Sequence, residues 1–264
     1  MRHPLLACRD VAVGHGERCL LRGLDLEVQA GERWVIVGPN GAGKSSLLMV
    51  LAGARAPQRG RVELGGRPIG QWSVEELAGL RAMVADRWVD PFELDVLEAV
   101  EAARFRLGLG ARRAAQADAR AGGSGPALQC LQAMDCAHLA QRDIRTLSRG
   151  ERQRVALAAA LAQEAALMLL DEPISHQDPR HQVLVLQELK ERRACTFIGA
   201  LHDINAAARF ATHALLLYGD GRWQAGPARE ALNCAALSAL FDTEIVQIEV
   251  DAHRVFMAAG ESIA

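Results

Sequence analysis

The sequence predicts an α/β fold: a mixed sheet covered by helices, with an antiparallel β part near the start and a helical block inserted in the middle. Three observations predict it. A buried strand, a glycine-rich loop and a helix follow one another over residues 34–52. Helical patterns dominate residues 92–163. Beyond that block, short apolar strands alternate with helices, which is typical of a parallel sheet covered on both faces.

The first part of the chain is rich in strand patterns. Segments 5–13 and 19–28 alternate between apolar and polar residues as strands do, and strands are also expected at 61–64 and 82–85. Gly14-His15-Gly16 suits a turn between the first two, and Gly65-Gly66 suits a hairpin after the third. Ser73 and Glu76 form a capping box, which predicts a short helix between the third and the fourth.

The middle and the end of the chain differ in pattern. Helices are expected at 95–106, 111–121, 126–134 and 149–163, with a flexible break at Gly122-Gly123-Ser124-Gly125. Strands are then expected at 167–170, 195–200 and 214–217, helices at 180–193 and 204–211, and a last hairpin at 244–250 and 254–258. We therefore expect a single domain over 1–264, with a core of residues 1–86 and 166–264 and a helical subdomain at about 87–165.

Composition excludes several classes of protein. The chain has 264 residues and a net charge of −2, so we expect no nucleic-acid partner. Six scattered cysteines without a C-x-x-C pair indicate free thiols in a reducing compartment. Cys130, Cys136 and His138 fit no zinc spacing, and buried small side chains are the favoured interpretation of these cysteines. No secretion signal or bilayer-spanning run is recognised, so we expect a soluble chain whose membrane role needs a partner.

The strongest motif is the loop after the strand at 34–37. It reads Gly38-Pro39-Asn40-Gly41-Ala42-Gly43-Lys44-Ser45-Ser46 and leads directly into a helix. In this context the glycines let backbone N–H groups face one concavity, where the helix N-terminus also favours phosphate. Lys44 is then expected to reach the β- and γ-phosphates of a nucleoside triphosphate, and the Ser45 hydroxyl to ligate Mg²⁺.

Two carboxylates follow the apolar strand at 167–170. Asp171 and Glu172 come at its carboxyl end, where ligands bind in open α/β sheets. Asp171 is expected on the Mg²⁺ side, directly or through water, and Glu172 to polarise an attacking water. Two solvated acids at a strand end are the alternative, which the upstream glycine loop makes less favoured.

A third motif, Leu147-Ser148-Arg149-Gly150-Glu151, stands just ahead of that strand. Together the three motifs resemble the ATP-binding-cassette (ABC) ATPases over essentially the whole chain. Their signature sequence, normally L-S-G-G-Q or L-S-G-G-E, lies at this place. The resemblance implies a homodimer in which Ser148, Arg149, Gly150 and Glu151 of one subunit close over ATP held by the other. The alternative is an ordinary helix start with Ser148 as N-cap.

Four further positions are compared with that family. Asp178, in Ser175-His176-Gln177-Asp178, resembles the D-loop at the dimer interface, or simply caps the next helix. His202 matches the switch histidine that contacts the γ-phosphate. His15 stands where an aromatic residue stacks on adenine, and is otherwise a turn residue. Asp86 replaces a glutamine that senses Mg²⁺, and an aspartate there can also ligate the ion.

Arg149 replaces the first signature glycine. Its side chain either points away from the nucleotide or adds a positive charge beside the γ-phosphate. With Asp86, it supports the hypothesis of an active but slow ATPase.

The segment His202-Asp203-Ile204-Asn205, followed by Ala206–Arg209, is similar to the ATPase subunits of bacterial importers for iron-siderophores, haem and cobalamin. This implies a subunit peripheral to the cytoplasmic face of the inner membrane, bound to a permease and served by a substrate-binding protein. Two alternatives stay open: a cassette ATPase that is not linked to transport, and a regulatory module that binds nucleotide without turnover.

Overall fold

The computed structural model describes residues 3–16, 18–85, 93–104, 125–251 and 253–259. It divides into two compact units. The first unit comprises Met1–Gln71 and Thr196–Ala264, and the second comprises Trp72–Cys195. These units are not the subdomains expected from the sequence, since two strands and two helices of the expected core belong to the second unit. The expected subdomain bounds stay a prediction.

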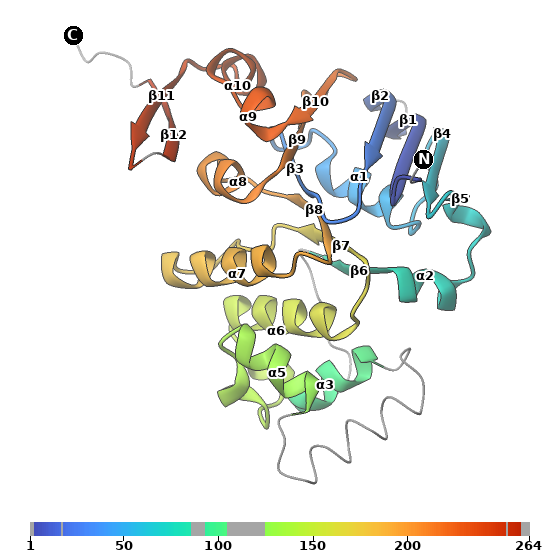
Figure 1. The fold of residues 1–264 in the computed structure, drawn as a ribbon, viewed down its shortest axis with the longest axis vertical. Coiled ribbons are helices and arrows are strands. Elements are labelled where there is room, and N and C mark those ends of the chain that lie inside the picture. The colour runs from blue at the N-terminus through green and yellow to red at the C-terminus, as the bar shows by residue number, and fades with distance from the viewer. Residues whose placement is uncertain (1–2, 17, 86–92, 105–124, 252, 260–264) are drawn as a thin grey trace. The chain divides into compact units, whose positions relative to one another are not determined.

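The first unit begins with the antiparallel sheet expected from the sequence (Figure 1). Its strands, in the order β2-β1-β4-β5, are β2 (Arg18–Val28), β1 (Leu6–His15), β4 (Arg59–Leu64) and β5 (Arg67–Pro68). Leu6 of β1 pairs with Val28 on one side and with Leu64 on the other, and all three are buried. The turn at Gly65-Gly66 joins β4 to β5, as predicted.

The turn expected at Gly14-His15-Gly16 is wrong in its bounds. β1 continues through His15, which pairs with Arg18. Irregular register between β1 and β2 lets the strand run on. Gly14 serves a close approach rather than a turn, because a Cβ there would lie 2.4 Å from the Arg18 carbonyl oxygen.

The first unit also holds four strands of the mixed sheet, in the order β10-β9-β3-β8. They are β10 (Trp223–Pro227), β9 (His213–Leu217), β3 (Arg33–Val37) and β8 (Thr196–Ala200). β3 runs parallel to β8 and β9, whereas β10 is antiparallel to β9. All of β8, and β3 and β9 after their first residues, are buried. This burial explains why these strands are continuously apolar.

The remaining elements of this unit are short. The helices are α1 (Lys44–Leu51), the 3₁₀ turn η1 (Ile69–Gln71), α8 (Ile204–Phe210), α9 (Ala228–Ala231) and α10 (Cys234–Phe241). β11 (Ile245–Val250) and β12 (His253–Ala258) form the expected last hairpin. Asn205 of α8 ties this hairpin down, since its amide and carbonyl groups both bond the backbone of Phe256.

The second unit combines helices with two strands (Figure 1). The strands β6 (Arg81–Val84) and β7 (Leu167–Asp171) are parallel. The helical elements are α2 (Val74–Leu80), α3 (Val96–Ala103), α5 (Pro126–Ala133), η3 (Ala137–Leu139), η4 (Ile144–Thr146), α6 (Arg149–Ala162) and α7 (Pro179–Glu191). α6 is buried continuously over residues 153–162 and packs against α3, α5 and β6. Small alanines allow this close packing on every side.

Some expectations fall on parts of the chain that are not described. The expected helix at 111–121, most of the glycine break and Asp86 lie outside the described residues. None of the helices in the described ranges has the length and apolarity that a bilayer crossing requires. The six cysteines carry free thiols.

Candidate nucleotide site

The glycine loop connects β3 to α1 in the first unit. Gly41 and Gly43 adopt φ angles of 79° and 100°, which side chains with a Cβ rarely adopt. Gly38 is glycine for another reason, because a Cβ there would lie 2.4 Å from the carbonyl oxygen of Leu217 in β9. The loop therefore turns tightly at the carboxyl end of β3 and presents the N-terminus of α1, a position that favours an anion.

Lys44 is the first residue of α1 and is only 6 % exposed. Its Nζ donates hydrogen bonds to the carbonyl oxygens of Gly38, at 2.8 Å, and Pro39, at 3.1 Å. The ammonium group is thus folded back over the glycine loop, where a cation complements bound phosphate. Ser45 follows at the second helical position and is exposed. Its hydroxyl is the kind of hard oxygen ligand that Mg²⁺ prefers.

His202 follows β8 at the same edge of the sheet as the glycine loop. The N–H of Leu201, just before it, donates to the carbonyl oxygen of Ile36 in β3 at 3.3 Å. Asp203, just after it, caps α8 by accepting two backbone N–H bonds at 2.7 and 3.0 Å. His202 is therefore an exposed residue fixed between a strand end and a helix cap. This placement is consistent with the predicted contact to the γ-phosphate.

The two predicted acids lie at the carboxyl end of β7 in the second unit. Asp171 is the last residue of the strand and is 6 % exposed. Glu172 adopts a φ of 52°, which costs roughly 1–2 kcal/mol for a residue other than glycine. The hydroxyl of Ser175 donates to Glu172 Oε2 at 2.9 Å, and the amide of Gln153 donates to the Glu172 carbonyl oxygen at 3.4 Å. These contacts fix both the backbone and the carboxylate of Glu172.

Sequence reasoning missed the contacts that Ser175 and Gln153 make with Glu172. Ser175 lies three residues after the glutamate, a spacing that a side-chain contact within one loop allows. Gln153 lies on α6 between Arg152 and Arg154, just before the apolar run of that helix, and no pattern in the sequence marked it.

Ser148 is the N-cap of α6 and forms a complete capping box with Glu151. Its Oγ accepts from the Glu151 N–H at 3.3 Å, while its own N–H donates to Glu151 Oε2 at 2.8 Å. The Ser148 hydroxyl also donates to Glu151 Oε2 at 2.7 Å. These bonds from Ser148, with smaller contributions from the Arg142 and Arg154 charges, hold the pKa of the Glu151 carboxyl below its usual range. The helix-cap interpretation of Ser148 is thus satisfied within one chain, and it is compatible with the signature role.

Packing explains why the signature motif of this chain keeps a glycine at position 150. A Cβ at Gly150 would lie 3.0 Å from the carbonyl oxygen of His176, so a side chain there would displace the backbone of the expected D-loop. His176 itself has a φ of 61°. Arg149 is exposed, so a side chain is tolerated at that position. The start of α6 and the expected D-loop are therefore packed against each other in the second unit.

Asp178 is the N-cap of α7, the simpler of its two predicted roles. It accepts the His181 backbone N–H at 3.0 Å and pairs with His181 Nδ1 at 2.7 Å. These two hydrogen bonds hold the pKa of the Asp178 carboxyl below its usual value. His181 Nε2 also lies 3.3 Å from an oxygen of Asp135. Sequence reasoning missed His181, which had no motif to mark it.

The predicted site residues fall into two groups. In the first unit the glycine loop, Lys44 and His202 share one edge of the sheet. In the second unit Glu172, Gly150 and Asp178 lie on segments that contact one another. His15 ends β1, and its contact with adenine stays a prediction. The meeting of both groups around one nucleotide and the role of Asp86 also stay predictions.

Comparisons with known proteins identify the family. The model of the family described as "ABC transporter" matches residues 21–175. A hemin import ATP-binding protein, HmuV, of Pseudomonas putida is 40 % identical over 94 % of this chain and 96 % of its own length. The ferric enterobactin transport ATP-binding protein FepC of Escherichia coli is 35 % identical over 79 % of this chain and 76 % of its own length.

Solved structures have the same fold. A metal-chelate type ABC transporter in an inward-facing conformation matches with a TM-score of 0.79 and 25 % identity, covering 98 % of this chain and 99 % of that one. A dimeric ATP-binding cassette bound to ADP and phosphate matches with a TM-score of 0.68 and 25 % identity, covering 85 % and 99 %. With the glycine loop, the acid pair and the signature helix in the places described above, this chain belongs to the ABC transporter family.

Proposed function

We propose that this chain is the ATP-hydrolysing subunit of a bacterial importer for hemin. The observation that carries the proposal is the similarity to hemin import ATP-binding proteins along nearly the whole chain, which includes relatives of 40 % and 38 % identity. The glycine loop and the acids at the end of β7 supply the ATPase chemistry. An iron-siderophore or a cobalamin is the competing cargo, and the ferric enterobactin relative favours the former.

The nucleotide is held by the first unit. The Lys44 ammonium and the N-terminus of α1 complement the phosphates of ATP. His202, at the same sheet edge, contacts the γ-phosphate and orients it for attack. The His15 ring stacks on adenine, with less contact area than a larger aromatic side chain provides.

The available oxygen ligands fit Mg²⁺. The Ser45 hydroxyl and the Asp171 carboxylate are hard oxygen donors, and Asp86 is a further candidate ligand. Held by these residues, Mg²⁺ would supply positive charge that offsets the charge of the phosphates.

Glu172 acts on the attacking water. Its carboxylate accepts a hydrogen bond from that water and polarises it towards the γ-phosphorus, so that the bond to the ADP oxygen breaks and phosphate leaves. The hydrogen bond from Ser175, at 2.9 Å from Oε2, orients the carboxylate for this step. A fixed carboxylate lowers the entropic cost of reaching the reactive geometry.

Two copies of the chain complete two sites. Ser148 and Gly150 of one subunit donate to the γ-phosphate held by the other, with Asp178 at the interface between them. ATP binding closes this homodimer and hydrolysis reopens it. The motion is passed to a permease at the cytoplasmic face of the inner membrane, which receives hemin from a substrate-binding protein.

Cargo and coupling are tested by reconstituting the chain with the permease encoded beside it in lipid vesicles. ATP-dependent accumulation of hemin, in excess of ferric siderophore and cobalamin, is the expected result. Accumulation of ferric siderophore alone would move the assignment to the competing cargo. Failure of the chain to co-purify with any polytopic membrane protein would favour a cassette ATPase outside transport.

A further inference from the structure

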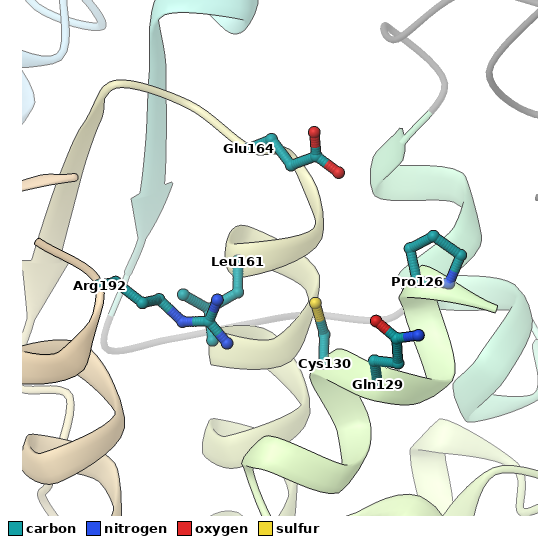
Figure 2. A pocket seen from close by; sticks show the side chains of 6 residues that line it. All are labelled: Pro126, Gln129, Cys130, Leu161, Glu164 and Arg192. Carbon is teal, nitrogen blue, oxygen red and sulfur yellow. The ribbon is translucent and has the colours of Figure 1, made fainter. Parts of the chain in front are cut away.

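A pocket in the second unit lies away from the predicted catalytic residues. It opens between the first turn of α5, the end of α6 and the end of α7, with a volume of about 290 Å³. Figure 2 shows the side chains that line it: Pro126, Gln129, Cys130, Leu161, Glu164 and Arg192. Glu164 precedes β7, whereas Asp171 ends it. A five-residue strand spans about 16 Å, so the pocket is separate from the acids.

Two arginines beside this pocket each have a buried nitrogen that lacks an acceptor among the described residues. Arg104 is 8 % exposed, and burying a guanidinium without full hydrogen bonding is costly. Among the described residues, no acceptor lies within hydrogen-bonding distance of the buried Arg104 Nη1 or the buried Arg192 Nε. Oε1 of Glu164 lies 3.8 Å from Nη2 of Arg104, and the Glu164 side chain is 61 % exposed. The three charges leave a net positive charge beside the pocket.

Cys130 lines the pocket, and the charges of both arginines act on its thiol. Burial raises the pKa of the Cys130 thiol, and the charges of Arg192 and Arg104 oppose that rise. Both guanidinium groups therefore act on a sulfur that lines the pocket. In Figure 2 the guanidinium of Arg192 extends from α7 towards Leu161 and Cys130.

The start of α5 adds a third favourable feature. Gly125 is its N-cap and offers no side chain to the first helical N–H groups, and Pro126 is the first helical residue. No acidic residue lies in the first turn of this eight-residue helix. Within the described part of the chain, the helix itself supplies no acid to its own N-terminus, and its dipole favours an anion near Pro126, which lines the pocket.

We propose that this pocket binds a phosphate group, either as free phosphate or on a small phosphoester. Guanidinium groups bind phosphate through paired charge-assisted hydrogen bonds, which would satisfy the buried Nε of Arg192, a residue that lines the pocket. The buried charge of Arg104, 3.8 Å from the pocket-lining Glu164, adds attraction for the anion. The volume is at the lower end for small-molecule sites, and Pro126 and Leu161 give it apolar walls. These features suit a phosphate carrying a short organic group as well as the free ion.

Phosphate binding at the glycine loop must first be removed, because that loop also attracts phosphate. Calorimetric titration of inorganic phosphate and of glycerol 3-phosphate is therefore carried out on the full chain carrying Lys44→Ala. Saturable binding at millimolar or lower concentration is expected. The phosphoester binds more tightly if the apolar walls contribute, and the free ion if they do not.

Three further substitutions in the Lys44→Ala background test whether the phosphate binds in this pocket. Arg192→Gln is expected to weaken binding at least tenfold, and Glu164→Gln to strengthen it, because a competing carboxylate is removed. Arg193→Gln, an exposed neighbour with the same change of charge, is expected to have no effect. Glu164 is largely exposed, so its variant keeps the test valid even if Arg192→Gln does not fold. Any of three outcomes would overturn the proposal. They are no binding to Lys44→Ala, equal effects of the Arg192→Gln and Arg193→Gln substitutions, and weaker binding to the Glu164→Gln variant.

Discussion

Ser148→Ala separates the two roles proposed for the first residue of the signature motif. The chain contains a matched control, because Ser73 forms a second capping box at the start of α2. The Glu76 N–H donates to Ser73 Oγ at 3.1 Å, and the Ser73 N–H donates to Glu76 Oε2 at 2.7 Å. The corresponding distances for Ser148 and Glu151 are 3.3 and 2.8 Å. As helix caps the two serines are nearly equivalent.

The two variants should therefore lose similar stability. Replacing a serine N-cap by alanine costs about 1 kcal/mol, which lowers Tm by about 2–4 °C in a chain of this size. Thermal unfolding followed by circular dichroism measures this loss for Ser148→Ala and Ser73→Ala. A much larger loss in either would show that its capping box is more than a local contact.

The two variants should differ in activity. If Ser148 donates to the γ-phosphate of the partner's ATP, alanine removes a hydrogen bond to a charged group worth about 1.5–3 kcal/mol. This corresponds to a roughly 10- to 100-fold slower hydrolysis. Phosphate release from saturating ATP should fall by that factor in Ser148→Ala and stay unchanged in Ser73→Ala. Equal rates in the two variants would refute the signature role and leave Ser148 as a helix cap.

Three other outcomes are expected. Ser175→Ala should lower kcat about tenfold with little change in KM, because the 2.9 Å hydrogen bond that orients Glu172 is lost. Ser175→Thr should restore kcat, because it keeps the hydroxyl. A rise in KM as large as the fall in kcat would contradict a positioning role. Glu151→Gln should make the free energy of unfolding less dependent on pH below the ordinary carboxyl pKa of 4.5. A carboxyl with a lowered pKa stabilises the fold above that value, and this contribution is lost as the pH falls. Chemical denaturation between pH 3 and 6 measures the change, and a pH profile unaltered by the substitution would contradict it. Burial raises the pKa of Cys195 to about 11, so alkylation at pH 8, followed by mass spectrometry, should be about a hundredfold slower in the native chain than in urea; equal rates would show that the thiol is not buried.

Much of the fold could be predicted because local pattern and tertiary environment agree. The apolar strand at β3 lies between two parallel neighbours, so burial on both faces enforces the continuous apolar pattern that marked it. The capping boxes at Ser73 and Ser148 set helix starts through contacts within four residues. Such short-range chemistry is readable from sequence.

The errors came where distant residues decide the local structure. Gly14 looked like a turn residue, but its missing Cβ accommodates the carbonyl oxygen of Arg18 and the side chain of Gln58. The left-handed backbone of Glu172 depends on the loop that follows it and on Gln153 of α6. No sequence pattern marks a contact of that kind.

The candidate site shows the same division. Lys44 and the two acids at the end of β7 were identified because each belongs to a contiguous motif. The structure was needed to explain why Gly150 is kept although Arg149 replaces the neighbouring glycine of the family. A Cβ at position 150 would lie 3.0 Å from the carbonyl oxygen of His176. His181 went unnoticed, because its two carboxylate neighbours come from separate segments of the chain.

The central claim is that Glu172 polarises the water that attacks ATP, and phosphate release by Glu172→Gln tests it most directly. Glu191→Gln is the matched control, since Glu191 is exposed at the end of α7 and carries the same change of charge. Removing the carboxylate that acts on the water should lower turnover at least about a hundredfold, while ATP binding and the activity of Glu191→Gln stay normal. Turnover unchanged by Glu172→Gln would contradict the account.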